Sequence, residues 1–346
     1  MSFQVCPLPR HATDRILMAH GGGGRLTNQL IESVFLPAFS NPALDSHHDG
    51  ATLYTNGARI AMTTDTYVVD PLIFPGGNIG DLAVNGTVND LAMCGARPLA
   101  LSAAFVLEEG LAMETLRTIV ASMAEAARVS GVPIVTGDTK VVDRGKGDGV
   151  FVNTTGIGVV VASKPVGPQF VRPGDAVLVS GDLGSHGITI LSVRGGLEFE
   201  GPVKSDTASV WPAVEALLKA GIEVHCLRDL TRGGLSSALN EIATVAGVRV
   251  TIEESSIPVS EVVYSACELL GLDPLYVANE GRFVAFVPEC DAERALEVMR
   301  SKVVSAGAIL AGTVHENASG IVTIHSRIGG HRVLNMLSGE QLPRIC

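Results

Sequence analysis

Residues 63–91 read TTDTYVVDPLIFPGGNIGDLAVNGTVNDL and continue from a strand that we predict over Arg59–Thr64. Within this stretch, Asp65 and Asp90 stand beside apolar runs. An unpaired carboxylate in such surroundings is costly, so each aspartate needs a partner in the fold. Taken singly, either one is better explained as a turn or helix-capping residue.

Two more aspartates lie in comparable settings, Asp49 in the run HDGA and Asp229 in the run RDLTRGGL. Carboxylates that converge from different segments are how proteins hold Mg²⁺ against a triphosphate. The four aspartates together therefore favour a site for Mg²⁺ and a nucleotide, which no single one of them would.

Further along the chain, strands and helices alternate. Apolar residues recur at three- and four-residue spacing from Leu116 to Ala127, and Gly131 stands where a helix cap is expected. We predict a strand over Phe151–Val161, rich in Val and Thr. We also predict a buried strand over Pro133–Thr136 that runs directly into a loop at 137–140. This alternation indicates an α/β (α+β) protein.

Two glycine-containing segments could contact phosphates. The loop at 137–140 offers backbone N–H groups, a hydroxyl and a cation, but it is not a Walker A loop, and an ordinary turn is the alternative. The glycine run at 21–24 could wrap phosphates, although flexible linkers look the same. The residues concerned are Gly21, Gly22, Gly23, Gly24, Gly137, Asp138, Thr139 and Lys140.

The second half repeats the α+β pattern after a boundary that we predict at 164–174, where prolines and glycines cluster. Glu280 precedes a glycine at the start of a predicted strand over Phe283–Val287; it could be a base, a metal ligand or a surface turn residue. His186, in the run GSHG, is expected in a structural turn. We predict an N-terminal segment at 1–48, domains at 49–165 and 170–328, and a mobile arm at 329–346.

Bulk properties narrow the function. The formal net charge of −11 argues against nucleic-acid and anionic-membrane surfaces, which need basic patches. There is no signal-peptide core and no apolar run long enough to span a membrane. The six cysteines are scattered without a Cys-x-x-Cys pair, which fits reduced thiols of a cytoplasmic protein.

The final residue, Cys346, is itself unusual. An exposed terminal thiol is normally avoided, and thiolates are good nucleophiles and acyl carriers. Arg344 favours the thiolate, whereas the terminal carboxylate opposes it. An accidental terminal cysteine is the alternative to a functional one.

These runs together resemble the HypE family of hydrogenase maturation factors, in the aminoimidazole ribotide synthetase (PurM-like) superfamily. The resemblance extends from about His20 to Cys346. The aspartate motifs are shared across the superfamily, and the terminal PRIC is the most family-specific part. The matching runs are AHGGGG, TTDTYVVDPLIFPGGNIG, LAVNGTVNDL, VTGDTKVV, RDLTRGGL, ANEG and PRIC. One departure is Ser185, where the family often has Asp.

The resemblance implies a two-domain PurM-like fold whose first domain pairs with its twin in a homodimer. It implies ATP as the nucleotide, with the ATP site near the dimer interface, and Mg²⁺ held by Asp49, Asp65, Asp90 and Asp229. Asn85 falls in the matching motif around Asp90, Lys140 and Glu280 fall on active-site motifs, and Cys346 falls on the cysteine that accepts a carbamoyl group.

The implied reaction is the ATP-dependent dehydration of an S-carbamoyl group on Cys346 to a thiocyanate. Phosphate is a far better leaving group than the amide oxygen, and water must be excluded so that the activated group is not hydrolysed. The implied partners are a HypF-type carbamoyltransferase as donor and a HypC–HypD complex that receives cyanide for the iron of [NiFe]-hydrogenase.

Two other functions remain open at this level. Another superfamily ATPase is one; however, a selenophosphate synthetase would need a reactive residue near the glycine run, and Cys6 lies well before it. An aminoimidazole ribotide synthetase would not need a terminal cysteine. The other is a non-catalytic carrier that shuttles a group on Cys346 and hydrolyses no ATP.

Overall fold

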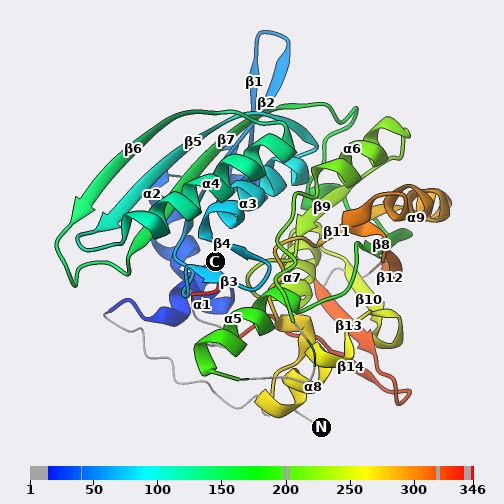
Figure 1. Cartoon of the computed structure of the whole chain (residues 1–346). Coiled ribbons are helices and arrows are strands. Elements are labelled where there is room, and N and C mark those ends of the chain that lie inside the picture. Colours follow the sequence, from blue (N-terminus) through cyan, green and yellow to red (C-terminus); the bar gives the residue numbers. More distant parts are fainter. Residues whose placement is uncertain (1–14, 40, 198–200, 202, 317–319, 339–343) are drawn as a thin grey trace.

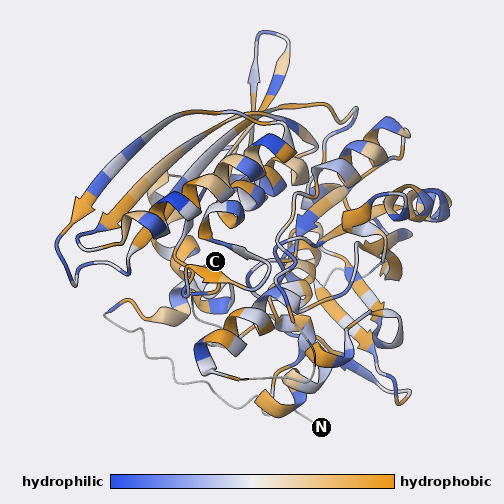
Figure 2. Cartoon of the chain, in the orientation of Figure 1, coloured by the Kyte–Doolittle hydropathy of each residue, from blue (hydrophilic) through white to orange (hydrophobic). Residues whose placement is uncertain are grey.

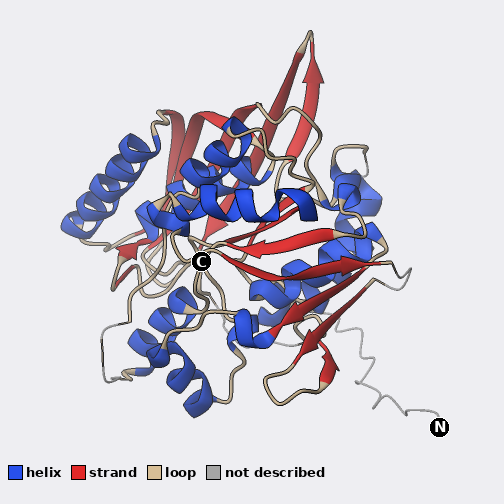
Figure 3. Cartoon of the chain, turned by 90° about the vertical axis from the view of Figure 1, so that its right-hand side faces the viewer, coloured by secondary structure: helices blue, strands red, loops and turns tan. Residues whose placement is uncertain are grey.

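The computed structural model describes residues 15–39, 41–197, 201, 203–316, 320–338 and 344–346. Two sheets, each with its own helices, form the two halves of the molecule (Figures 1 and 3). The C-terminus lies at the centre of the molecule in both views. In the described part of the chain, no helix is both long and apolar enough to cross a membrane.

The first sheet has the order β1-β2-β7-β5-β6, in which only β5 and β6 are parallel. Helices α3 and α4 cover one of its faces (Figure 1). The elements are β1 (Ala51–Thr55), β2 (Ala58–Tyr67), α3 (Ile79–Met93), β5 (Ala96–Glu108), α4 (Met113–Ser130), β6 (Ile134–Val142) and β7 (Val150–Val160). A small two-stranded sheet, β3 (Ile73–Phe74) and β4 (Gly77–Asn78), precedes α3.

Helix α3 begins at a capping box. The side chain of Asn78 accepts a hydrogen bond from the Gly80 backbone, and the carboxylate of Asp81 accepts one from the Asn78 N–H group. Nearly all its residues are buried, so it lacks the alternation that marks a surface helix. Helix α4 is amphipathic and buries Ile119, Met123 and Ala127, as its spacing predicts.

The second sheet has the order β14-β13-β10-β12-β8-β11-β9. Every residue of β8 is buried because both faces of the sheet are covered: Ala176 and Leu178 belong to the cluster that includes α6 and α9, whereas Val177 and Val179 belong to the one that includes α7. The strands are β8 (Asp175–Val179), β9 (Cys226–Asp229), β10 (Arg249–Glu253), β11 (Phe283–Pro288), β12 (Ile309–His315), β13 (Ile321–His325) and β14 (His331–Val333). The helices are α5 (Ser185–Gly195), α6 (Trp211–Lys219), α7 (Gly234–Ala246), α8 (Glu261–Leu270) and α9 (Ala292–Arg300).

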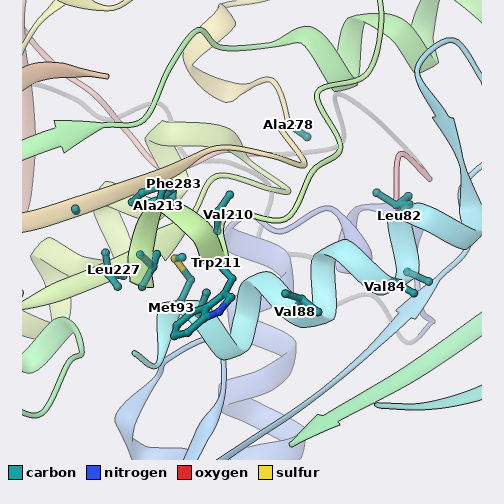
Figure 4. Packing of buried hydrophobic residues seen from close by; sticks show 14 of the residues in the cluster. Leu82, Val84, Val88, Met93, Val210, Trp211, Ala213, Leu227, Ala278 and Phe283 are labelled. Carbon is teal, nitrogen blue, oxygen red and sulfur yellow. The ribbon is translucent and has the colours of Figure 1, made fainter. Parts of the chain in front are cut away.

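The two halves share a hydrophobic core. Trp211 of α6 lies beside Met93 of α3, with Val88 further along the same helix (Figure 4). Asn89 joins the halves by polar contacts, because its side chain donates to the Ala208 carbonyl and accepts from the Val210 N–H group. Helix α3 is therefore held by both domains, and this fixes the position of Asp90, which follows Asn89 in the helix.

The N-terminal segment packs on the second domain. It forms α1 (Arg25–Leu30), a π-helical turn (Ile31–Phe35) and α2 (Leu36–Phe39). Its glycine run makes close backbone approaches: a side chain at Gly23 would meet Arg232, and one at Gly24 would meet the Leu337 carbonyl. Packing thus requires Gly23 and Gly24, whereas a side chain at Gly21 would meet nothing within 4 Å.

Four predictions about local structure are wrong. The strand predicted as buried over Pro133–Thr136 is exposed at Ile134, Val135 and Thr136, because it belongs to the edge strand of the first sheet. Residues 137–140 lie inside the edge strand β6, because they pair in register with Ala103–Val106 of β5. Ser185 and His186 open helix α5 instead of forming a turn. The segment from Gly329 is not wholly an arm, because residues 331–333 form β14 and Leu334 and Leu337 are buried; residues 339–343 lie outside the described part.

Candidate active site

A polar cleft of about 400 Å³ lies at the junction of the two domains and the N-terminal segment. Of the residues predicted from the sequence, it collects Gly23, Asp49, Asp65, Asp90, Asp229, Glu280 and Cys346. They come from the N-terminal segment, the loop before β1, β2, α3, the end of β9, the turn before β11 and the chain terminus. The cleft thus brings the four aspartates and the terminal cysteine together.

Three of the aspartates form a compact carboxylate cluster. Asp49, Asp90 and Asp229 each offer an oxygen, and these atoms all lie within 4.8 Å of one another. Thr63 supports the cluster from β2, since its hydroxyl lies 2.6 Å from Asp90 Oδ2 and 3.1 Å from the Asp49 carbonyl. Carboxylate oxygens at this spacing suit a hard divalent cation.

Burial and mutual repulsion raise the pKa of these carboxyl groups. For Asp90 the pKa is well above its ordinary value, first because of burial and then because of the negative charges of Asp229 and Asp49. The pKa of Asp229 rises to about 6, again mainly through burial, although the Arg228 guanidinium opposes the rise. Bringing such groups together without a cation is costly, so the cluster fits Mg²⁺.

Arginine residues that the sequence analysis missed balance part of this charge. The Arg228 Nε atom lies 2.7 Å from Asp49 Oδ1, and its Nη2 atom lies 2.5 Å from Glu241 Oε2. Arg232 lines the cleft and donates to the Gly21 carbonyl across 3.0 Å. Both stand in the quoted run RDLTRGGL, so their motif was visible although their role as counter-charges was not.

Glu280 is buried, and its Oε1 atom has no hydrogen-bond partner. Burial raises its pKa well above the ordinary value, and the charges of Asp229 and Asp206 add to the effect. Its backbone is fixed, because the Glu280 N–H group donates to Asp206 Oδ1 and its carbonyl accepts from Asn89. A fixed carboxyl group with an unpartnered oxygen is suited to taking up a proton.

Cys346 places its side chain in the same cleft. Burial raises the pKa of the thiol to about 12, with Arg232 opposing the rise and Glu280 adding to it. The docked cysteine is therefore a neutral thiol over the physiological pH range. Of the arm predicted at 329–346, the terminal residue thus lines the site.

Other predicted residues lie outside the cleft lining. Lys140 and Asp138 form an exposed ion pair of 2.7 Å on the edge strand β6, with Gly137 and Thr139 beside them. Asn85 is buried in α3 and donates to Thr207. Of the glycine run, only Gly23 reaches the cleft; Gly21, Gly22 and Gly24 do not line it.

Two family models match the chain, one in each domain. Residues 47–160 match the family of AIR synthase related proteins, N-terminal domain, and residues 172–325 match its C-terminal domain. The two matches leave residues 161–171 between them.

Several relatives and solved structures cover nearly the whole chain. The carbamoyl dehydratase HypE of Azotobacter vinelandii is 52% identical over 95% of this chain and 96% of its own length. A solved HypE–HypF complex superposes with a TM-score of 0.85, 47% identity, and coverage of 89% of this chain and 99% of that one. A solved HypE in complex with ATP gives a TM-score of 0.81, 49% identity, and coverage of 96% and 100%.

Proposed function

The chain belongs to the AIR synthase related proteins and, among them, to the HypE carbamoyl dehydratases, and from this we propose roles for the residues of its cleft. The cleft binds ATP, and Cys346 carries the S-carbamoyl group that is dehydrated to a thiocyanate. The observation that carries the proposal is that Cys346 shares one cleft with the three-carboxylate cluster and Glu280.

The chemical problem is the removal of water from an amide. Transfer of the terminal phosphoryl group of ATP to the carbamoyl oxygen forms an O–P bond and releases ADP. One of the two protons on nitrogen is lost with this transfer; cleavage of the C–O bond then expels phosphate, and loss of the second proton leaves a C≡N group on the sulfur of Cys346. Water must be kept from the activated group throughout, and the burial of the thiol in the cleft favours this.

The carboxylate cluster provides the ligands for Mg²⁺. Asp49, Asp90 and Asp229 would hold the ion, and Asp65 of β2 would add a fourth carboxylate to the lining of the same cleft. When bound, the ion would neutralise phosphate charge and stabilise the transferring phosphoryl group.

Glu280 is the candidate base for the proton on nitrogen. It lines the cleft with Cys346, its Oε1 atom is unpartnered, and its raised pKa makes the carboxylate a stronger base. Arg232 also lines the cleft. Its guanidinium, from the same chain as Cys346, would face the anionic phosphoryl group and stabilise its charge.

Lys140 fits this scheme through a homodimer. It stands on β6, where Val135 and Val141 are also exposed, so the edge of the first sheet offers polar and apolar residues to a second copy (Figure 2). A twin packed on this edge would bring Lys140 into an interface instead of leaving it on the surface. A HypF-type protein would supply the carbamoyl group, and a HypC–HypD complex would receive the cyanide.

A non-catalytic carrier is the rival function. A carrier needs an accessible thiol but has no use for three mutually repelling carboxylates around it, and the raised pKa values of Asp90 and Glu280 would only destabilise it. The cluster therefore favours the dehydratase.

The test follows the mass of the intact protein. The chain is incubated with carbamoyl phosphate, ATP, Mg²⁺ and a HypF-type carbamoyltransferase, beside Cys346→Ala. The proposal requires a carbamoyl adduct on wild type alone, which then loses the mass of one water only when ATP is present. Equal labelling of the variant would refute the role of Cys346. An adduct that never dehydrates would refute the dehydratase and leave the carrier as the remaining function.

A further inference from the structure

The last three residues occupy a cradle built by both domains. The Val68 N–H group donates to an oxygen of the terminal carboxylate of Cys346 across 3.0 Å, and the Asp70 N–H group donates to the Arg344 carbonyl across 3.3 Å. In return, Arg344 Nε donates to the Val68 carbonyl across 3.1 Å. The segment that leaves β2 therefore holds the terminal peptide on both sides of Ile345.

Between these two points, His186 of the second domain binds the Ile345 carbonyl. Its Nε2 atom lies 2.6 Å from that oxygen, and its Nδ1 atom lies 2.8 Å from Ser205 Oγ. A carbonyl only accepts, so Nε2 carries the proton and Nδ1 accepts from the serine hydroxyl. The ring is fully buried and meets Phe74 edge-on with 5.6 Å between centroids, which fixes its orientation.

Arg344 anchors the peptide on the first domain. Its guanidinium lies 2.8 Å from Asp148 Oδ2, in the loop between β6 and β7. Its backbone adopts the left-handed region with φ +53°, which a residue with a side chain rarely does unless contacts hold it. Ile345 is buried in the main hydrophobic cluster, so the peptide cannot slide by one residue without exposing it.

We propose that His186 and Asp148 are positioning residues, which set the register of the terminal peptide so that the sulfur of Cys346 lies at the carboxylate cluster. The inference deepens the proposed function and rests on it for its catalytic consequence. The docking itself does not depend on any activity. A recognition site for the peptide Arg-Ile-Cys thus spans the two domains.

The first measurement is the rate at which iodoacetamide alkylates Cys346 in the full-length chain. Protease Glu-C releases residues 341–346, so the modification is read by mass on the peptide QLPRIC. His186→Ala should speed alkylation about fivefold, as expected for the loss of one buried hydrogen bond, and Asp148→Asn about twofold, because its ion pair is partly exposed. His186→Gln keeps a donor near the Nε2 position and should recover much of the protection.

Two controls separate release of the peptide from general loosening. Asp143→Asn changes an exposed aspartate beside the same loop and should alkylate at the wild-type rate. The buried Cys94 and Cys226 report on the fold, and they should stay protected in every variant. If Cys94 and Cys226 are also labelled in His186→Ala, that variant has lost its fold. The proposal is then tested by the alkylation rates of Cys346 in His186→Gln and Asp148→Asn relative to wild type. Wild-type alkylation of Cys346 in variants that keep their fold would overturn the proposal.

The second measurement is a single turnover of carbamoylated enzyme with ATP. His186→Ala should lower the rate of dehydration about fivefold while leaving the ATP concentration for half-maximal rate unchanged, because it moves the thiol and not the nucleotide. A change in that concentration alone would also refute a positioning role. If wild type never dehydrates but the alkylation pattern holds, the cradle stands and the proposed function fails.

Discussion

Asp229→Asn should make the nucleotide-free protein more stable and at the same time remove its response to ATP and Mg²⁺. In the folded chain the pKa of Asp229 is raised from 3.8 to about 6, mainly by burial. One pKa unit corresponds to ~1.4 kcal/mol, so the ionised carboxylate destabilises the fold by roughly 3 kcal/mol. Asparagine has the shape of the protonated acid and avoids this cost.

The sign of the pH dependence follows from the direction of the shift. A folded-state pKa above the unfolded value means that the folded chain binds the proton more tightly, so stability is lost as pH rises from about 4 to about 6. The stabilising effect of Asp229→Asn should therefore be near zero at pH 3.5 and reach roughly 3 kcal/mol above pH 6.5. Urea unfolding at a series of pH values measures it.

The ligand response gives the second half of the test. A ligand at a hundredfold excess over its dissociation constant stabilises the folded state by about 2.7 kcal/mol. Wild type should gain this from ATP with Mg²⁺, and Asp229→Asn should gain almost nothing. Asp143→Asn, at an exposed position, is the matched control and should behave as wild type in both respects. If Asp229→Asn were no more stable than wild type above pH 6.5, the argument from burial would be wrong.

Three further predictions follow from other parts of the site. Cys346→Ser should abolish carbamoyl labelling while keeping the thermal shift produced by ATP; a lost shift would mean that the thiol helps to bind the nucleotide. Gly23→Ala should lower the free energy of unfolding in urea by about 2 kcal/mol more than Gly131→Ala does. Both glycines have positive φ, but only a side chain at Gly23 would meet Arg232, at 2.5 Å; equal losses of stability would contradict the close approach. Lys140→Ala should change the free energy of unfolding by under ~0.5 kcal/mol, because its ion pair is exposed, yet slow dehydration if a twin covers β6; unchanged single-turnover rates would remove it from the mechanism.

The elements that the sequence predicted well are those with one exposed face. Helix α4 shows its buried stripe at Ile119, Met123 and Ala127, and its cap at Gly131. Helix α3 was missed because it is apolar almost all round and carries Gly80 and Gly86, which let the Ile119 carbonyl and the Tyr67 hydroxyl approach. Periodicity cannot reveal a helix that is covered on every side.

The edge strand β6 was misread for a related reason. Gly137 and Asp138 have low strand propensity, so a single sequence favours a turn there. In the fold, the Gly137 backbone packs so closely on Ala103 of β5 that a side chain would lie 2.0 Å from the Ala103 carbonyl. The glycine is required by the strand pairing, which only the tertiary structure shows.

The site was more predictable than the fold around it, for a chemical reason. Aspartates beside apolar runs are costly wherever they are placed, so several of them in one chain had to share a purpose. The sequence could not show which cations balance them. Arg228 reaches the cleft from β9 itself, whereas Arg232 reaches it from the loop after β9, which turns back at Gly233, with φ +81°, against the glycine run of the N-terminal segment.

The docked state of Cys346 also bears on where its thiol would react. The raised pKa of the thiol means that it is a poor nucleophile where it lies in the structure, and its neighbours Glu280 and Asp65 would repel a thiolate there. We therefore expect attack on a carbamoyl donor to occur outside the cleft, where the thiol would regain its ordinary pKa. The S-carbamoyl product is uncharged, so it can return without the electrostatic penalty that excludes the thiolate. The same acidic surroundings would thus favour the loaded cysteine over the reactive thiolate at the carboxylate cluster.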